Sequence, residues 1–208
     1  MPAATSDPPY APLLKRRPVQ ARSIARVDAI LDAAAALAAD DLEALTMRAV
    51  GARAGVPPAT IYQFFDDREA LIQALAVRYV AATPAVLESA LDASLDSWPQ
   101  ALERVVDGFA GLLRREPAMR TLWLAGAMDA ATARFAAAAD DGIAERLRAR
   151  LVEISGREDR GTDTDWRFLV TLVGDLLKRS FRHDPDGDGF LLDRSKRVAV
   201  LYSGDLLA

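Results

Sequence analysis

The sequence predicts an all-α protein, and three of its features lead to that prediction. Hydrophobic residues make up 51% of the 208 residues, and many of them are alanine, the strongest helix former. The 12 Gly and 11 Pro residues gather at a few boundaries, as breaks between helices require. Between those boundaries apolar residues recur every three or four positions, and no alternation typical of β-strands persists.

We expect three parts along the chain. Residues 1–18 are rich in Pro and end in the basic run KRRP, which predicts a disordered basic arm. Residues 19–82 predict a small helical domain, because Thr83 and Pro84 interrupt its last helix. Residues 83–208 predict a larger helical domain, which brings the expected number of helices to about nine.

The small domain begins with a helix over residues 22–40, whose apolar side chains fall on one stripe. Thr46 then caps a short second helix that ends at Gly55. A third helix is expected over 58–65 and a fourth over 68–82, with two aspartates at its start. In the larger domain we expect helices near residues 85–97, 100–115, 118–127, 130–155, 163–182 and 190–206.

The composition excludes several classes of site. Without cysteine the chain has no disulfide, thiolate metal site or cysteine nucleophile, which fits a reducing cytoplasm. The single histidine, His183, adjoins an acidic loop, and we expect neither a cofactor nor a metal. Residues 1–20 hold no run of signal-peptide length, and no later segment has an uninterrupted apolar run long enough to span a membrane, so we expect a soluble cytoplasmic protein.

The formal net charge of −4 is unevenly distributed. Five basic residues fall within twelve positions that hold no acid: Lys15, Arg16, Arg17, Arg22 and Arg26. Residues 81–208, in contrast, hold 17 basic and 21 acidic side chains. Because the attraction of phosphate is local and is screened within ~10 Å, such a cluster can serve a polyanion even in an acidic chain.

The stretch GVPPATIYQFF, residues 55–65, combines two prolines with three aromatic residues. A helix this short buries too little to be stable alone, so its neighbours must hold one side of it. Three of its residues can pack inward: Ile61, Phe64 and Phe65. The other side then exposes a hydroxyl, a phenol and an amide, from Thr60, Tyr62 and Gln63. Hydroxyl groups suit phosphate oxygens and Gln can pair with adenine, so this side favours DNA.

Two glycines favour the same interpretation. Gly51 offers a position without a side chain, where the third helix can cross the second closely, and Gly55 supplies the tight turn between them. This is the geometry of a helix-turn-helix, although a chance pair of helices would show the same spacing.

Residues 20–75 carry a resemblance to a known family. The stretches QARSIARVDAILDAAAALAADD and LTMRAVGARAGVPPATIYQFFDDREALIQAL resemble the N-terminal domain of TetR-family transcriptional regulators. The shared pattern is a basic lead-in, the I-L-D-A-A helix, T-M-R at the start of the second helix, and A-G-V-x-x-A/G-T-I/L-Y-x-x-F. The resemblance implies a DNA-binding domain over 19–82 and an effector-binding and dimerisation domain over 83–208.

The resemblance also implies which residues contact DNA. Phosphate contacts would come from Thr46, Thr60, Tyr62 and the helix start at Arg68. Six residues would lie over the major groove: Arg48, Pro57, Pro58, Ala59, Gln63 and Phe64. The basic residues Arg16, Arg17 and Arg22 would lie near the backbone or the minor groove.

Three positions depart from the family pattern. Arg68 stands where Lys is more usual, Pro58 where a small polar residue is common, and Ile24 at a frequently basic position. The last two leave the base preference open. Phe64 either contacts a thymine methyl group or packs inward.

The helices expected near 163–182 and 190–206 resemble the family's dimerisation helices, which form a four-helix bundle with their copies. The implied interface comprises Leu169, Leu172, Val173, Leu176, Leu177, Leu191, Leu192, Val198, Leu201 and Tyr202. The alternative is that this face closes the protein's own core. A palindromic site read by two heads ~34–36 Å apart favours a homodimer.

Six large residues are candidates for an effector pocket: Phe109, Met119, Trp123, Met128, Phe135 and Trp166. Each sits at helical spacing, where such a residue more often belongs to a plain core. The scarcity of polar groups on these faces favours an apolar or aromatic effector.

The acidic stretch DPDGDG, residues 184–189, matches the opening of an EF-hand calcium loop. The twelfth position, which should hold a bidentate Glu, is Ser195. We therefore interpret the stretch as an acidic turn.

Together these features predict a transcriptional repressor that a small-molecule effector releases from a palindromic DNA operator. The effector would prefer a conformation whose recognition helices no longer match the half-site spacing. Two alternatives stay open: a helical partner-binding module that kept the fold without DNA binding, and an all-helical enzyme. Against the enzyme stand the absence of Cys, the single His, and the lack of a Gly-rich phosphate loop or a nucleophile elbow.

Overall fold

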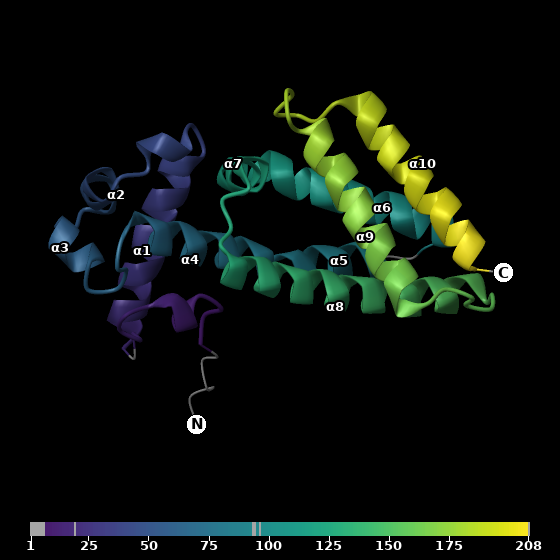
Figure 1. The fold of residues 1–208 in the computed structure, drawn as a ribbon, viewed down its shortest axis with the longest axis horizontal. Coiled ribbons are helices and arrows are strands. Elements are labelled where there is room, and N and C mark those ends of the chain that lie inside the picture. The colour runs from purple at the N-terminus through teal and green to yellow at the C-terminus, as the bar shows by residue number, and fades with distance from the viewer. Residues whose placement is uncertain (1–6, 19, 93–94, 96, 208) are drawn as a thin grey trace. The chain divides into compact units, whose positions relative to one another are not determined.

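A computed structural model describes residues 7–18, 20–92, 95 and 97–207. These residues form ten α-helices and two 3₁₀ helices, with one isolated β-bridge between Asp159 and Leu207 (Figure 1). The predicted all-α fold class is confirmed. By its contacts the chain divides into two compact units. The first unit contains residues up to Ala81 together with Pro117–Ala133, and the second contains Ala82–Glu116 and the residues from Arg134 onward.

The first unit is built around a core between α1 and its neighbours. Apolar residues at helical spacing put Val27, Ile30, Leu31 and Ala34 on the buried side of α1, where α2, α4 and α7 pack against it. The helices of this unit are η1 (Ala11–Leu13), α1 (Ala21–Ala38), η2 (Leu42–Ala44), α2 (Met47–Ala54), α3 (Pro58–Ile61), α4 (Arg68–Val80) and α7 (Pro117–Ala125).

Helix α4 is the most deeply buried element of the first unit. Its N-cap is Asp67, whose carboxylate accepts the Ala70 N–H at 2.8 Å, and residues 71–77 are buried in succession. Among the described residues one stretch, Arg68–Leu91, is long and apolar enough to cross a membrane, with a mean hydropathy of 1.5. Half of that stretch is buried in the structure, as in the core helices of soluble proteins, so the stretch is weak evidence for a membrane span.

Residues 117–133 belong to the first unit, although the sequence assigned them to the larger domain. Ala118 and Leu122 of α7 are buried in the core that α1 and α4 form. The side chain of Gln73 on α4 is also buried: its amide donates to the Ala127 carbonyl at 3.0 Å and accepts the Asp129 N–H at 3.0 Å. These bonds tie the segment after α7 to the middle of α4.

The prediction of a disordered arm over residues 1–18 is corrected for residues 7–18. Tyr10 is buried, and Leu13 and Leu14 pack against the core, so this stretch folds onto the first unit through η1. The Pro content suggested disorder, but the three large apolar side chains provide enough burial to hold the stretch in place. Residues 1–6 lie outside the described residues.

The second unit packs α9 and α10 against each other and against α6. Its core includes Leu87, Leu102, Leu147, Leu151, Trp166 and Leu169. The helices are α5 (Thr83–Leu91), α6 (Trp98–Arg115), α8 (Ala130–Ser155, of which the residues from Arg134 lie in this unit), α9 (Asp163–Ser180) and α10 (Gly189–Leu206).

A charged network closes the loop between α8 and α9. The Arg148 guanidinium pairs with Asp159, and its Nη1 donates to Asp163 at 2.6 Å. The Trp166 indole N–H also donates to Asp159, at 3.2 Å. Burial raises the pKa of Asp159, but the hydrogen bonds from Arg148, Gly161 and Trp166 outweigh burial, so the pKa lies below its ordinary value.

The acidic stretch 184–189 forms a turn before α10. The Asp186 N–H donates to the Asp184 carboxylate at 2.9 Å, Gly187 takes a φ of +84°, and Asp188 is the N-cap of α10. These carboxylates therefore stabilise the turn and the helix start. Among the described residues, no group of three or more His, Asp or Glu side chains is arranged to hold a metal ion.

Candidate nucleic-acid interface

The turn between α2 and α3 depends on the two glycines. A Cβ atom on Gly51 would lie 2.8 Å from the Val56 carbonyl oxygen, so only Gly allows the chain after α2 to pass this close. Gly55 ends α2 with a φ of +67°, in the left-handed region. Both glycines do what the spacing predicts, and the turn directs α3 across α2.

The segment after Gly55 has one buried and one exposed side. Ile61 and Phe65 are fully buried in the core of the first unit. On the other side Tyr62 is 47% exposed, and Pro57, Pro58, Ala59 and Gln63 are exposed as well, with Thr60 half-buried. The segment therefore presents a phenol, an amide and a hydroxyl to solvent.

Helix α3 is shorter than the sequence predicts. The sequence predicts a helix of two turns over 58–65, whereas α3 ends at Ile61. Tighter turns follow, in which the Gln63 N–H donates to Thr60 at 3.3 Å and the Phe64 N–H donates to Ile61 at 2.9 Å.

Phe64 does not lie where the resemblance placed it. Its side chain is only 5% exposed and packs in the core, so of the two alternatives that the sequence left open the structure has the inward one. The expectation that Phe64 lies over the major groove is therefore corrected.

Arg68 also has a different role from the predicted phosphate contact. Its Nε donates to the Leu45 carbonyl at 2.7 Å and its Nη2 donates to the Leu42 carbonyl at 2.6 Å. The forked guanidinium can reach both carbonyls, whereas the single ammonium of a Lys could not do so in this geometry. Arg68 therefore holds the chain that leads into α2.

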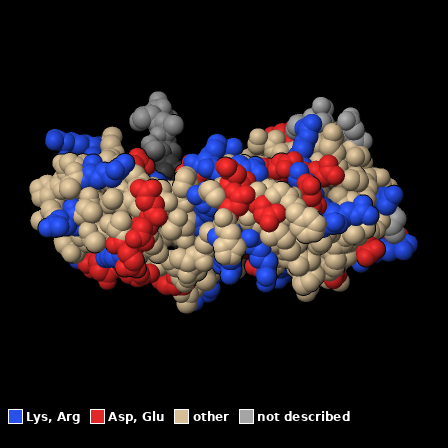
Figure 2. Space-filling view, turned by 90° about the horizontal axis from the view of Figure 1, so that it is seen from above, with Lys and Arg blue, Asp and Glu red and all other residues tan. Residues whose placement is uncertain are grey.

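The remaining predicted contacts are exposed. Thr46 caps α2, and its hydroxyl accepts the Ala49 N–H at 3.2 Å. Arg16, Arg17, Arg22 and Arg48 are exposed; Arg17 pairs with Asp7, and the other three form no ion pair within the described part of the chain. In Figure 2 the Lys and Arg side chains of this unit gather toward its left end and upper side, apart from a band of acidic side chains along its lower edge.

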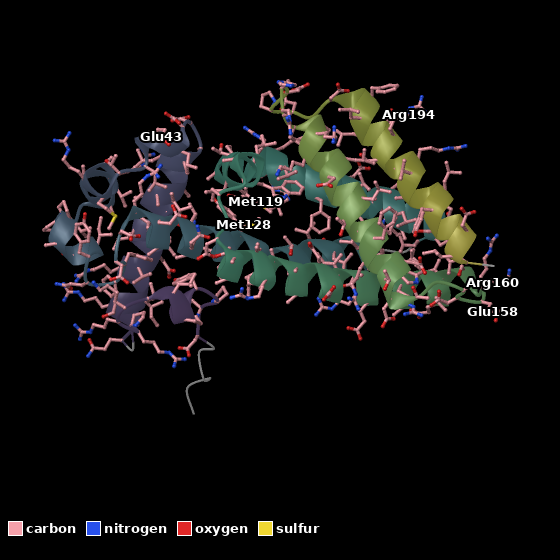
Figure 3. The ribbon with its side chains drawn as sticks, viewed as in Figure 1. Glu43, Met119, Met128, Glu158, Arg160 and Arg194 are labelled. Atoms are coloured by element: carbon pink, nitrogen blue, oxygen red, sulfur yellow. The ribbon has the colours of Figure 1, made fainter. Side chains whose placement is uncertain are left out.

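The six candidate pocket residues are divided between the two units. Met119, Trp123 and Met128 belong to the first unit, and the first and last of these are labelled in Figure 3. Phe109, Phe135 and Trp166 belong to the second unit, where Trp166 is fully buried and Phe135 is exposed. Trp166 donates to Asp159 and is part of the core, which fits the alternative that the sequence left open.

The second unit has a groove that the sequence did not predict. It encloses about 520 Å³ between α5 and α6 and is open to solvent. Its lining residues are Ala85, Val86, Ser89, Ala90, Arg104, Gly108 and Arg115, none of which is a predicted pocket residue. Arg104, Gly108 and Arg115 lie along one side of α6. This spacing is present in the sequence, but it indicates a groove only once α5 is known to pack beside α6.

The predicted dimer residues divide into two sets. Leu169, Leu177 and Leu192 are buried inside the second unit, so they serve its own core. The half-buried or exposed set comprises Leu172, Val173, Leu176, Leu191, Val198, Leu201 and Tyr202. The sequence missed two further apolar residues of α9 and α10, Phe168 at 51% exposed and Phe190 at 64% exposed. Phe190 lies eleven residues before Leu201, on nearly the same side of α10, and Phe168 lies four residues before Leu172.

Two models of one regulator family match this sequence. The model described as bacterial regulatory proteins, tetR family, matches residues 30–75, and the model described as tetracyclin repressor-like, C-terminal domain, matches residues 96–202. No curated protein matches the sequence.

Solved structures of regulators share the fold. A TetR-family transcriptional regulator from Streptomyces coelicolor is 29% identical, with 89% of this chain and 99% of that chain covered and a TM-score of 0.65. The fatty acid degradation regulator FadR from Bacillus halodurans is 16% identical, with 85% and 94% covered and a TM-score of 0.67. A TetR transcriptional regulator from Rhodococcus sp. RHA1 is 24% identical, with 87% and 97% covered and a TM-score of 0.59.

The C-terminal match alone covers more than half of the chain, and the N-terminal match covers the helix-turn-helix described above. The chain therefore belongs to the TetR family, and it is a DNA-binding transcriptional regulator with a ligand-binding C-terminal domain.

Proposed function

We propose that this regulator is a homodimeric repressor that binds a palindromic operator through α3 and leaves it when a small molecule binds in the C-terminal domain. The observation that carries the proposal is the two-sided segment 57–65. Its apolar side is held by the core, while Tyr62 and Gln63 are exposed side by side. We propose that it acts in the cytoplasm, where a DNA-binding repressor of this kind meets its operator.

The exposed groups suit the parts of a DNA duplex that they would meet. The hydroxyl groups of Thr60, Tyr62 and Thr46 would donate to phosphate oxygens, which sets the position of α3. Gln63 would reach base edges in the major groove, with Pro57, Pro58 and Ala59 against the bases or the thymine methyl groups. Arg16, Arg22 and Arg48 have no ion pair with a described residue, so binding to phosphate would break no ion pair within the described part of the chain.

A second copy of the chain is the proposed partner of α9 and α10. The two helices pack against each other, and outside that contact they expose Phe168, Phe190 and Leu201. The rings of Phe168 and Tyr202, whose centroids are 5.4 Å apart, bridge the two helices. Exposed apolar side chains on a pair of helices favour an association site, and a four-helix bundle with a symmetric copy would bury them.

For the effector we propose a small molecule with a mainly apolar or aromatic body. The large residues that the sequence singled out remain candidates for contacting it. The groove between α5 and α6 adds apolar walls from Val86, Ala90 and Gly108, with guanidinium groups from Arg104 and Arg115. A compound with an apolar body and an acidic group would suit that combination.

Selection of bound sequences from random duplex DNA tests the proposal most directly. We expect a palindromic site, with an affinity that falls steeply as the salt concentration rises. Compounds are then screened for release of the selected duplex. A chain that selects no duplex at low salt would favour the partner-binding module instead, and a selected site without two-fold symmetry would argue against the dimer.

A further inference from the structure

Residues 10–15 connect three elements of the first unit that lie far apart in the sequence. Tyr10 reaches α1, η1 contacts α4, and Lys15 reaches the turn that follows α3. Only four residues lie between the first of these contacts and the last. A stretch this short and this well attached fixes the distance between its two ends.

The first end of the stretch is anchored by Tyr10. Its side chain is 2% exposed in the core cluster of α1 and α4, and its hydroxyl donates to the Asp28 carboxylate on α1. Burial, and then the hydrogen bond to Asp28, raise the pKa of Tyr10, so the hydroxyl remains a donor at neutral pH. Leu13 and Leu14 add apolar contacts to the same core.

The other end of the stretch holds the turn after α3. Because α3 ends at Ile61, the carbonyl groups beyond it need donors from elsewhere in the chain. The Lys15 N–H donates to the Phe64 carbonyl at 2.9 Å. The Lys15 ammonium lies 2.9 Å from Asp66 Oδ1. Phe64 follows Tyr62 and Gln63 directly, so these bonds fix the end of the DNA-facing segment.

We propose that residues 10–15 form a brace that positions the segment 57–65 for DNA, and that Tyr10 is its positioning residue. The proposal rests on the proposed function, since it gives the brace a purpose in DNA binding. The brace is followed immediately by Arg16 and Arg17, which are exposed. It therefore holds the start of this basic pair beside the turn that follows α3 before DNA arrives, with the Arg17 guanidinium paired with Asp7.

The expected benefit is preorganisation. A mobile basic arm loses conformational freedom when it binds, and each ordered residue reduces the affinity. In this protein the conformational entropy of the stretch is already lost on folding, because Tyr10, Leu13 and Leu14 are packed. Without the Tyr10 anchor, this entropy would be lost when DNA binds, and the affinity would fall.

The test compares full-length Tyr10→Ala and Tyr10→Phe with the wild type. The first readout is hydrogen exchange at the Lys15 amide, followed by NMR. We expect protection in the wild type and in Tyr10→Phe, and free exchange in Tyr10→Ala. The second readout is affinity for the duplexes that the wild type selects from random DNA. We expect Tyr10→Ala to bind roughly tenfold more weakly, and Tyr10→Phe, which keeps the packed ring, to stay within about threefold.

Tyr79→Ala is the matched control, because it removes a buried ring of the same core cluster on α4, outside residues 7–18. An equal loss of DNA affinity in both alanine variants would reduce Tyr10 to a general core residue and overturn the proposal. So would an unprotected Lys15 amide in the wild type, or normal affinity in a Tyr10→Ala protein that has lost the protection. A wild type that selects no duplex would instead refute the proposed function, while the exchange data would still report on the brace.

Discussion

Among the described residues, Tyr62 is the single large hydrophobic side chain that the first unit leaves exposed, whereas the second unit exposes Phe135, Phe168, Phe190 and Leu201. The first unit thus completes its own core and presents mainly polar groups, which suits a hydrated, charged partner such as DNA. The second unit leaves apolar surface in water, which suits another protein surface. From this difference we expect different partners for the two units, and the expectation can be tested on each of them.

The largest expected effect comes from placing charge on the exposed apolar face of the second unit. In the double variant Phe168→Asp with Leu201→Asp, dimerisation should weaken by at least about a hundredfold, because the two carboxylates would have to be buried without partners. Light scattering during size-exclusion chromatography measures the change. Ala137→Asp, at an exposed position of α8, is the control and should remain dimeric. A wild type that is already monomeric at tens of micromolar would remove the basis of the comparison.

On the first unit the sharpest test is Tyr62→Ala. Loss of the phenol should reduce affinity for the selected duplex by roughly 10- to 100-fold, as expected for a contact to a charged phosphate, with little change in the melting temperature. Fluorescence anisotropy with labelled duplex measures the affinity. Tyr62→Phe keeps the ring and loses the hydroxyl, so its affinity for the duplex should lie between those of Tyr62→Ala and the wild type. Unchanged binding by Tyr62→Ala would show that the exposed side of 57–65 does not meet DNA.

The role of Arg68 predicts a smaller effect on folding. Arg68→Lys should lower the free energy of unfolding by about 1–3 kcal/mol, because one of the Leu42 and Leu45 carbonyls loses its charged donor. Urea denaturation measures the difference, with Arg53→Lys at an exposed position of α2 as the control. If stability held and only DNA affinity fell, the phosphate role that the resemblance implied for Arg68 would be supported instead.

The smallest effect concerns pH and the second unit. The pKa of Asp159 is lower in the folded protein than in the unfolded chain, where it has its ordinary value of 3.8. The ionised carboxylate therefore stabilises the fold at a pH above 3.8, and this contribution is lost as the pH falls below that value. Asp159→Asn should therefore be less stable than the wild type near pH 7, and the gap should narrow below about pH 4. Thermal melts across pH 3–7 measure the gap. Glu158→Gln, which is largely exposed, should show no such convergence.

Much of the first unit could be predicted because local chemistry determines it. Gly51, Gly55, Thr46 and Asp67 each act within a few residues of their position, so spacing alone identified the turn and the caps. The fate of Phe64 and Arg68 depended instead on contacts across the fold. Nothing near Arg68 in the sequence indicates that the Leu42 and Leu45 carbonyls lie within reach of its guanidinium.

The second unit was predicted less completely, for a related reason. Helix bounds followed from Pro, Gly and capping residues, and α8 and α9 begin where the sequence predicts. Which face of α9 turns inward depends on several helices at once. The leucine stripe therefore identified Leu169 and Leu177, which are buried, and missed Phe168 and Phe190, which are exposed.

In the first unit, the burial of Tyr10 was missed because the Pro-rich composition of residues 1–18 favoured disorder more strongly than three isolated apolar residues favoured packing.

The bonds of Gln73 to Ala127 and Asp129 have a consequence for how the molecule can be taken apart. A fragment cut after Ala81 would keep every residue of the helix-turn-helix. It would lose Ala118 and Leu122 from its interior, and the Gln73 amide would lose both of its backbone partners. The helix-turn-helix is therefore not separable from Pro117–Ala133, a segment that completes its core from much later in the sequence.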